Sequence, residues 1–246
     1  DYITGNIDVA VGTTVDMDIR SLTVANSKTI TNNGTWTAPG AGSTLTCAGS
    51  ATFVGEGMNF YDFSANVASS TITFQGTKIY TVANNLNLAG GDGAELYVRS
   101  HDNVATAIIS NTPGNTQTVD YVRVEEVDGT AANHIAATNS WDVTRNLSFW
   151  DFAPMLYTFE TTGNWDIPGN WEQNVLPSVT DNVIVPNLVV LTLNGDRTIN
   201  DVTIAAGGEI VVGGDEFTIN GASDIDGTIT AGAGTIDAEG AFSAEN

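Results

Sequence analysis

Short runs in which apolar and polar residues alternate are the feature that most constrains the fold of this chain. In residues 15–19, Val15, Met17 and Ile19 point one way and Asp16 and Asp18 the other, as in a half-buried β-strand. Similar short runs recur at residues 22–24, 71–74, 86–88, 121–124, 182–185, 202–204, 209–212 and 217–219. Asn-Gly, Gly-Gly and Gly-Asp turn signals separate them. The pattern predicts an all-β protein with very little helix.

The shortness and close spacing of these runs favour one architecture within the all-β class. Strands of a β-sandwich are usually longer, whereas a β-solenoid builds each coil from several short strands separated by bends. The chain has 246 residues, enough for one elongated solenoid or two ordinary domains. We therefore expect a β-solenoid (parallel β-helix-like) of short rungs, with tandem β-sandwich domains as the alternative.

Internal similarity divides the chain into two related modules. Residues 18–25 align with residues 198–205 at an offset of 180, and Ile30 aligns with Ile210 at the same offset. Further matches join residues 44–46 to 228–230 and residues 56–57 to 239–240, at offsets of 184 and 183. Ordered matches of this kind indicate a repeated module. With a boundary near Pro154, we expect one solenoid module at 1–154 and a second, incomplete module at 155–246.

The charge balance excludes several kinds of partner. Asp and Glu number 29 against 7 Lys and Arg, which gives a formal net charge of −22. Binding to the phosphate backbone of a nucleic acid requires clustered Lys and Arg, so no nucleic-acid partner is expected. No stretch approaches the roughly 20 apolar residues of a membrane helix, so no membrane insertion is expected either. The single cysteine, Cys47, excludes an intrachain disulfide and suits a small packing position.

Two segments carry a resemblance to a known family. Residues 169–172 (Gly-Asn-Trp-Glu), 181–186 (Asp-Asn-Val-Ile-Val-Pro) and 202–208 resemble the repetitive β-solenoid modules of large secreted bacterial cell-surface, adhesin-like proteins. Residues 117–124, followed by 135–140 and 150–152, resemble the closing segment of such modules. The resemblance implies an extracellular or cell-surface location and a role in adhesion, matrix or fibre formation. It implies no catalytic residues.

The incomplete second module leads to an expectation of self-association. The sequence starts at Asp1 rather than Met, so either a targeting segment has been removed or the chain belongs to a longer protein. A solenoid that stops partway through a coil exposes unpaired backbone groups, which are a template for another strand. We expect a non-enzymatic structural subunit of an extracellular fibre or surface layer that forms a head-to-tail homopolymer. An excised piece of a longer array is the other interpretation. The residues expected at the joining ends are Ile7, Val9, Val11, Ile236 and Phe242.

Two tryptophans suggest a different function, that of a glycan-binding adhesin segment. Trp165 and Trp171 each follow an asparagine in a turn-rich stretch, and exposed aromatic faces pack well against sugar rings. Tryptophans in this setting more often cover the end of a solenoid coil and exclude water from its core. Surface glycans are therefore an alternative partner.

A third alternative is a polysaccharide-degrading β-helix enzyme. Such an enzyme needs carboxylates that converge on one groove. The best candidates are Asp120, Arg123, Glu125, Glu126 and Asp128. On one continuous strand Asp120 and Arg123 would point apart, so we do not expect catalysis there. His101 and His134 lie in polar turns without a neighbouring nucleophile.

No zinc-like spacing of Cys and His occurs, and calcium is the plausible ion for so acidic a chain. Asp16 with Asp18, and Asp224 with Asp226, would each place two carboxylates on one strand face. Neither pair fits a known calcium loop, and solvated strand faces explain them more simply. We expect no cofactor, with Ca²⁺ as the candidate if one binds.

Overall fold

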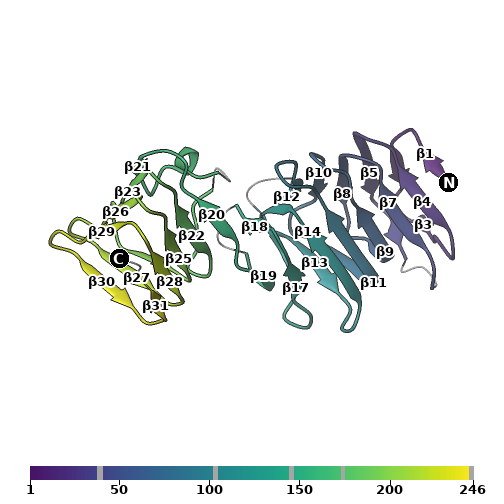
Figure 1. The fold of residues 1–246 in the computed structure, drawn as a ribbon. Helices are drawn as coiled ribbons and strands as arrows, with labels where there is room; N and C mark the ends of the chain where they lie inside the picture. Colours follow the sequence, from purple (N-terminus) through teal and green to yellow (C-terminus); the bar gives the residue numbers. More distant parts are fainter. Residues whose placement is uncertain (38–40, 102–104, 144–146, 173–174, 244–246) are drawn as a thin grey trace. The chain divides into compact units, whose positions relative to one another are not determined.

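The computed structural model describes all residues except 38–40, 102–104, 144–146, 173–174 and 244–246 (Figure 1). Among the described residues, the only helix is the short 3₁₀ turn η1 (Pro168–Asn170). The strands pair in parallel with the strands one coil before and after them. The predicted all-β solenoid is therefore confirmed. Tandem β-sandwiches are wrong, because sandwich sheets are built from antiparallel strands.

The chain forms two compact units, Asp1–Ala153 and Pro154–Asn246, each with its own hydrophobic core. Both units are three-faced coils. In each full coil the chain lays one short strand on each face and turns a corner between faces.

Unit 1 has the longer faces, and its strands are grouped here by face. Face 1 consists of β1 (Tyr2–Ile3), β4 (Ser21–Val24), β7 (Thr44–Cys47), β9 (Asn59–Ala65), β11 (Ile79–Ala89), β14 (Thr116–Asp120), β17 (Ile135–Ala137) and β19 (Trp150–Phe152). Face 2 consists of β2 (Ile7–Val9), β5 (Lys28–Asn32), β8 (Ala51–Gly55), β10 (Thr71–Phe74), β12 (Leu96–Ser100), β15 (Val122–Glu125) and β18 (Trp141–Asp142). Face 3 consists of β3 (Thr14–Val15), β6 (Thr35–Trp36), the first residues of β9 and β11, β13 (Ala107–Asn111) and β16 (Val127–Asp128).

Unit 2 repeats the scheme with fewer coils. Its face 1 consists of β20 (Leu156–Thr158), β22 (Asn182–Val185), β25 (Val202–Ile204), β28 (Ser223–Ile225) and β31 (Phe242–Ser243). Its face 2 consists of β21 (Gly163–Asn164), β23 (Val190–Thr192), β26 (Glu209–Val211) and β29 (Thr228–Thr230). Its face 3 consists of β24 (Arg197–Ile199), β27 (Glu216–Ile219) and β30 (Thr235–Ala238).

Strand register shows that the coils of the two units differ in regularity. In unit 2, Leu191 pairs with Ile210 and Ile210 with Ile229, a repeat of 19 residues. In unit 1, the repeat changes from 21 residues between Phe53 and Phe74 to 26 residues between Phe74 and Ser100. Extra residues in unit 1 are placed in the turns, so the inward columns stay aligned while the coil length varies.

The structure also corrects one match of the internal alignment. At the offset of 180, β4 aligns with β25 and β5 aligns with β26, which are consecutive strands of faces 1 and 2 in both units. The match of residues 44–46 with 228–230 is wrong, because it joins β7 on face 1 to β29 on face 2. Short Thr-apolar-Thr strands recur on more than one face, so this pattern alone does not identify the face.

Aromatic side chains from all three faces fill the centre of unit 1. Phe63 points inward from face 1, Phe53 from face 2 and Phe60 from face 3, and all three are almost fully buried. Their ring centroids lie 5.0 to 6.0 Å apart in tilted and edge-to-face contacts. Such contacts add to the free energy of burial, so this trio ties the three faces together.

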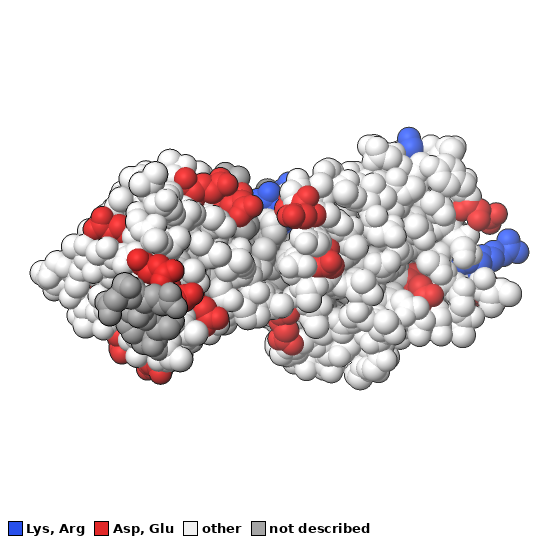
Figure 2. All heavy atoms as spheres, viewed as in Figure 1, with Lys and Arg blue, Asp and Glu red and all other residues white. Residues whose placement is uncertain are grey.

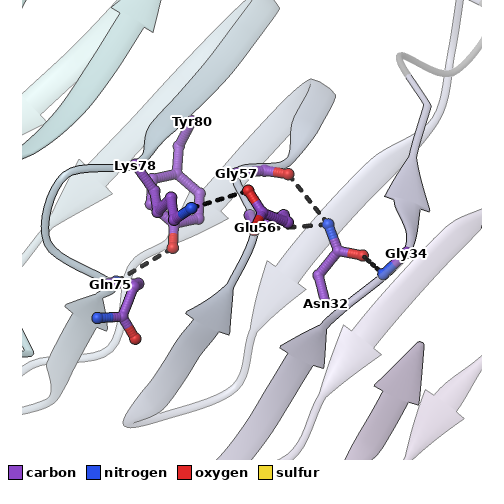
Figure 3. Close-up of polar contacts among 7 residues, drawn as sticks. All are labelled: Asn32, Gly34, Glu56, Gly57, Gln75, Lys78 and Tyr80. Carbon is purple, nitrogen blue, oxygen red and sulfur yellow. Dashed lines mark hydrogen bonds and ion pairs between the residues drawn. The ribbon is translucent and has the colours of Figure 1, made fainter. Parts of the chain in front are cut away.

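A buried asparagine holds one corner of unit 1 (Figure 3). Asn32 ends β5, points inward and is fully buried. Its Nδ2 donates to the carbonyls of Glu56 and Gly57, at 3.4 and 3.0 Å, and its Oδ1 accepts from the amide of Gly34 at 3.3 Å. The carboxamide thus replaces the ladder where the chain turns away from it, and links two successive coils.

A tyrosine has a similar role in the following coil (Figure 3). The Tyr80 hydroxyl donates to the Phe53 carbonyl at 3.3 Å and accepts from the Gln75 amide at 3.1 Å. Burial raises the pKa of Tyr80 from 10.0 to about 12. On the outside of the corner Lys78 Nζ lies 2.8 Å from Glu56 Oε2, in a partly exposed ion pair.

Candidate functional site

Figure 2 shows acidic residues in separate small groups over the face in view, with few basic residues and much uncharged surface. This matches the net charge of −22. No helix among the described residues is long and apolar enough to cross a bilayer.

The two acidic pairs do not share strand faces as expected. Strand β3 ends at Val15, and Asp18 sits in a turn with a φ of 46°, where its amide donates to Asp16 Oδ1 at 3.0 Å. Asp224 lies on β28, but Asp226 follows in the bend after that strand. The described residues contain no group of three or more His, Cys, Asp and Glu that could hold a metal ion.

Trp165 and Trp171 lie inside the core of unit 2. Their exposed fractions are 2% and 0%. The two rings pack edge to face with centroids 4.8 Å apart, and Trp171 Nε1 donates to the Trp165 carbonyl at 2.8 Å. Phe159 contacts Trp171 at the same centroid distance. Neither indole offers a free face to a sugar, so their place is that of core residues at the first coil of unit 2.

The residues considered for catalysis are spread over three faces of unit 1. Tyr121 has a φ of 51° and forms a corner, which leaves Asp120 on face 1 and places Arg123 and Glu125 on face 2. A continuous strand through residue 121 was expected, and that expectation is wrong. A second corner of the same kind at Glu126, with a φ of 54°, puts Asp128 on face 3. His101 is exposed in the turn after β12.

Two of these residues belong instead to a cluster on face 2. Arg123 lies over the rings of Tyr97 and Trp141, 5.8 and 5.4 Å from their centroids. The Tyr97 hydroxyl donates to Glu125 Oε2 at 2.5 Å, and Arg99 Nε lies 3.5 Å from the same oxygen. Burial and the neighbouring Glu125 raise the pKa of Tyr97 to about 12.

This cluster joins three coils through side chains. Strand β12 pairs with β15 and β15 with β18, so Tyr97, Arg123 and Trp141 form one column. Its acid and its bases contact one another, so we assign it a structural role. Tyr97 and Arg99 were missed in the sequence because they lie a full coil before Arg123 and Glu125.

The main concave surface of the described structure lies on face 1 of unit 1. Two hollows of about 280 and 560 Å³ adjoin there, and Thr118 of β14 lines both. We call this surface the face 1 groove. It crosses β7, β9, β11, β14, β17 and β19, a path of roughly 24 Å at the usual spacing of strands. Its polar lining residues are Thr44, Asp62, Ser64, Asn85, Asn87, Thr116, Gln117, Thr118, Asp120, Thr138 and Asp151.

The larger hollow exists because the ladder opens between β14 and β17. Thr138 N donates to the Val119 carbonyl, so Ala136 N should reach the carbonyl of Gln117. It donates instead to Gln117 Oε1 at 3.1 Å, while Gln117 Nε2 donates to the His134 carbonyl at 3.0 Å. The side chain is thus inserted between the strands. The floor beside it is shallow because Ala136 and Ala137 carry only methyl groups.

Two carboxylates stand at the rim of this hollow, each with a protein donor. Asp120 Oδ1 accepts from Thr138 Oγ1 at 2.9 Å and from Asn139 Nδ2 at 2.8 Å. Asp151 Oδ1 lies 2.9 Å from His134 Nδ1. These contacts fix the direction of each carboxylate and leave further acceptor sites on it. No pattern in the sequence indicated this pairing of coils.

The expected joining residues lie on strands at the edges of their sheets. Ile7 and Val9 belong to β2, half-buried and buried respectively, whereas Val11 follows that strand and is exposed. Ile236 lies on β30 and is 37% exposed. Phe242 lies on β31, where its backbone pairs with Ser223.

No protein-family model, curated protein or solved structure matches this chain.

Proposed function

We propose that the chain is a non-enzymatic structural subunit of an extracellular fibre or surface layer, and that copies join by continuing the coil. The observation that carries the proposal is that β1, β2 and β3, one strand from each face, each pair with a single neighbour. The extracellular location rests on the resemblance of residues 169–186 and 202–208 to secreted surface modules.

Backbone bonding shows which groups at this edge are available. In a parallel strand, alternate residues bond to opposite sides. The Val9 carbonyl accepts from Asn33 N in the next coil, so the N–H and C=O of Asp8 point to the outer edge. By the same reasoning, Tyr2 and Thr14 present outward groups. Unpaired backbone groups in a row favour addition of a further strand.

Apolar side chains of the same coil support an assembly contact. Tyr2, Val11 and Ile19 are 62%, 83% and 69% exposed. Burial of this surface against another coil would stabilise the contact in addition to the backbone bonds. The occupant we propose is the edge formed by β29, β30 and β31 of a second copy, which also offers one strand from each face.

The test is negative-stain microscopy with sedimentation analysis, on residues 1–246 and on material from the natural source. Asp8→Pro removes the outward N–H, and an edge strand tolerates proline there. We expect filaments from the unaltered chain and from Asp8→Ala, and short or no filaments from Asp8→Pro. Monomers at high concentration in both preparations, or filaments unaffected by Asp8→Pro, would contradict the proposal.

A further inference from the structure

We infer that the face 1 groove is a binding site for a neutral oligosaccharide or polysaccharide chain. The inference is independent of the fibre proposal, because it uses the outer side of paired strands and not their edges. It rests on the shape of the groove, the chemistry of its lining and the full backbone pairing of its central strands.

The lining matches a ligand that is rich in hydroxyl groups. It alternates carboxamide, hydroxyl and carboxylate side chains on adjacent coils: Asn87 Nδ2 donates to Ser64 Oγ at 3.2 Å, and Asn84 Nδ2 to Asp62 Oδ1 at 2.7 Å. Hydroxyl groups both donate and accept, so a sugar chain can bond to such a mixed surface along its length. The half-exposed Phe152 adds an apolar contact at one end.

Charge excludes one class of ligand. Among the described residues lining the two hollows none is Lys or Arg, whereas Asp62, Asp120 and Asp151 are present. A polyanion such as a uronate chain would be repelled. Each of the three carboxylates already accepts from, or lies against, a donor of the protein. They are therefore held in place as directed acceptors for ligand hydroxyls.

Backbone pairing argues against a peptide. An extended peptide that joins a sheet needs a free strand edge. Strands β9, β11 and β14 are paired or bonded on both sides along the groove, with β11 between β9 and β14. The site therefore contacts its ligand through side chains, at intervals set by the strand spacing of about 4.8 Å.

The inserted Gln117 side chain makes the larger hollow a defined feature of the fold. It bonds to both Ala136 N and the His134 carbonyl, so the widened gap costs no unsatisfied backbone group at these positions. Its Nε2 also lies 3.4 Å from Asn115 Oδ1, which in turn accepts from Asn133 at 3.0 Å. The hollow is thus braced by amide groups before any ligand arrives, which lowers the entropic cost of binding.

The test is calorimetric titration of residues 1–246 with cello-, xylo- and manno-oligosaccharides. Ala136→Phe fills the hollow from an exposed position and should weaken binding by at least about tenfold. Thr118→Val removes the hydroxyl that both hollows share and should weaken it about fivefold, the value of one neutral hydrogen bond. Thr52→Phe, an outward position of face 2, is the matched control and should leave affinity unchanged.

Galacturonate oligomers and oligolysine serve as comparison probes. We expect neither to bind and the neutral sugar to bind independently of salt, since no ion pair is formed. The inference is overturned if none of the neutral panel binds, if oligolysine binds and the sugars do not, or if Ala136→Phe and Thr52→Phe have the same effect. Circular dichroism of each variant confirms that it keeps the β-sheet spectrum.

Discussion

The amide of Ala136 donates to the side-chain oxygen of Gln117 and not to its backbone carbonyl, at 3.1 Å. One side chain thus separates two strands of a ladder that is otherwise regular, and its other end bonds to the His134 carbonyl. The polar groups stay paired although the strands separate.

Replacing this glutamine should loosen the ladder locally. In Gln117→Leu, Ala136 N and the His134 carbonyl lose a partner, which should cost about 1–3 kcal/mol of unfolding free energy. Hydrogen exchange followed by mass spectrometry should show faster exchange at Ala136. Thr116→Val, an exposed position on the same strand, is the control and should exchange like the unaltered protein. Unchanged protection in Gln117→Leu would show that the side chain is not holding the gap.

The buried corner asparagine should not tolerate aspartate. Asn32→Asp replaces the donor aimed at the Glu56 and Gly57 carbonyls with a carboxylate oxygen, so we expect a loss of about 3 kcal/mol or more at neutral pH. Asn33→Asp makes the same chemical change at an exposed neighbour and should stay within about 0.5 kcal/mol. Urea unfolding measures both. Equal effects at the two positions would contradict the role given to Asn32.

The single cysteine should react only when unit 1 opens. Cys47 is 1% exposed, and burial raises the pKa of its thiol to about 12. Because the thiolate is the reactive form, iodoacetamide should label native Cys47 at the rate of local opening. A Cys47→Ala chain that carries Thr116→Cys should label at the rate of a free thiol. Comparable rates for the two cysteines would mean that Cys47 is not shielded.

Stability should decline in strong alkali because of buried tyrosine. The pKa of Tyr80 is raised from 10.0 to about 12, so the unfolded chain loses this proton first. The contribution of the group is complete below pH 10.0 and is lost as the pH rises towards about 12. Tyr80→Phe should be less stable at neutral pH, by about 1 kcal/mol, but should decline less steeply in alkali. Adding Tyr97→Phe should flatten the curve further. Denaturant titrations at stepped pH give the slopes, and identical slopes would refute this origin.

Much of the fold was predictable from alternation alone, because inward and outward positions differ so clearly in chemistry. The corners were harder to predict. Tyr121 and Glu126 adopt positive φ although neither is glycine or asparagine, so no turn residue marks the places where the chain leaves a face. Asp120 and Arg123 were therefore placed on one strand.

The groove and the face 2 cluster depend on which coils are neighbours. In unit 1 the coil length is irregular, so Thr118 and Ala136, or Tyr97 and Arg123, cannot be matched by a fixed offset. One signal was present in the sequence. Gln117 stands in an inward column next to Leu86, where an apolar residue is the rule, and a polar residue in such a column needs partners.

The constant repeat of unit 2 has a consequence for how long the protein can be. Because Leu191, Ile210 and Ile229 follow at 19-residue steps, removing or duplicating one such block leaves each remaining column with a suitable neighbour. Length can then change in whole storeys through recombination within the gene, at little cost to folding. Unit 1, whose turns differ from one coil to the next, has no such freedom.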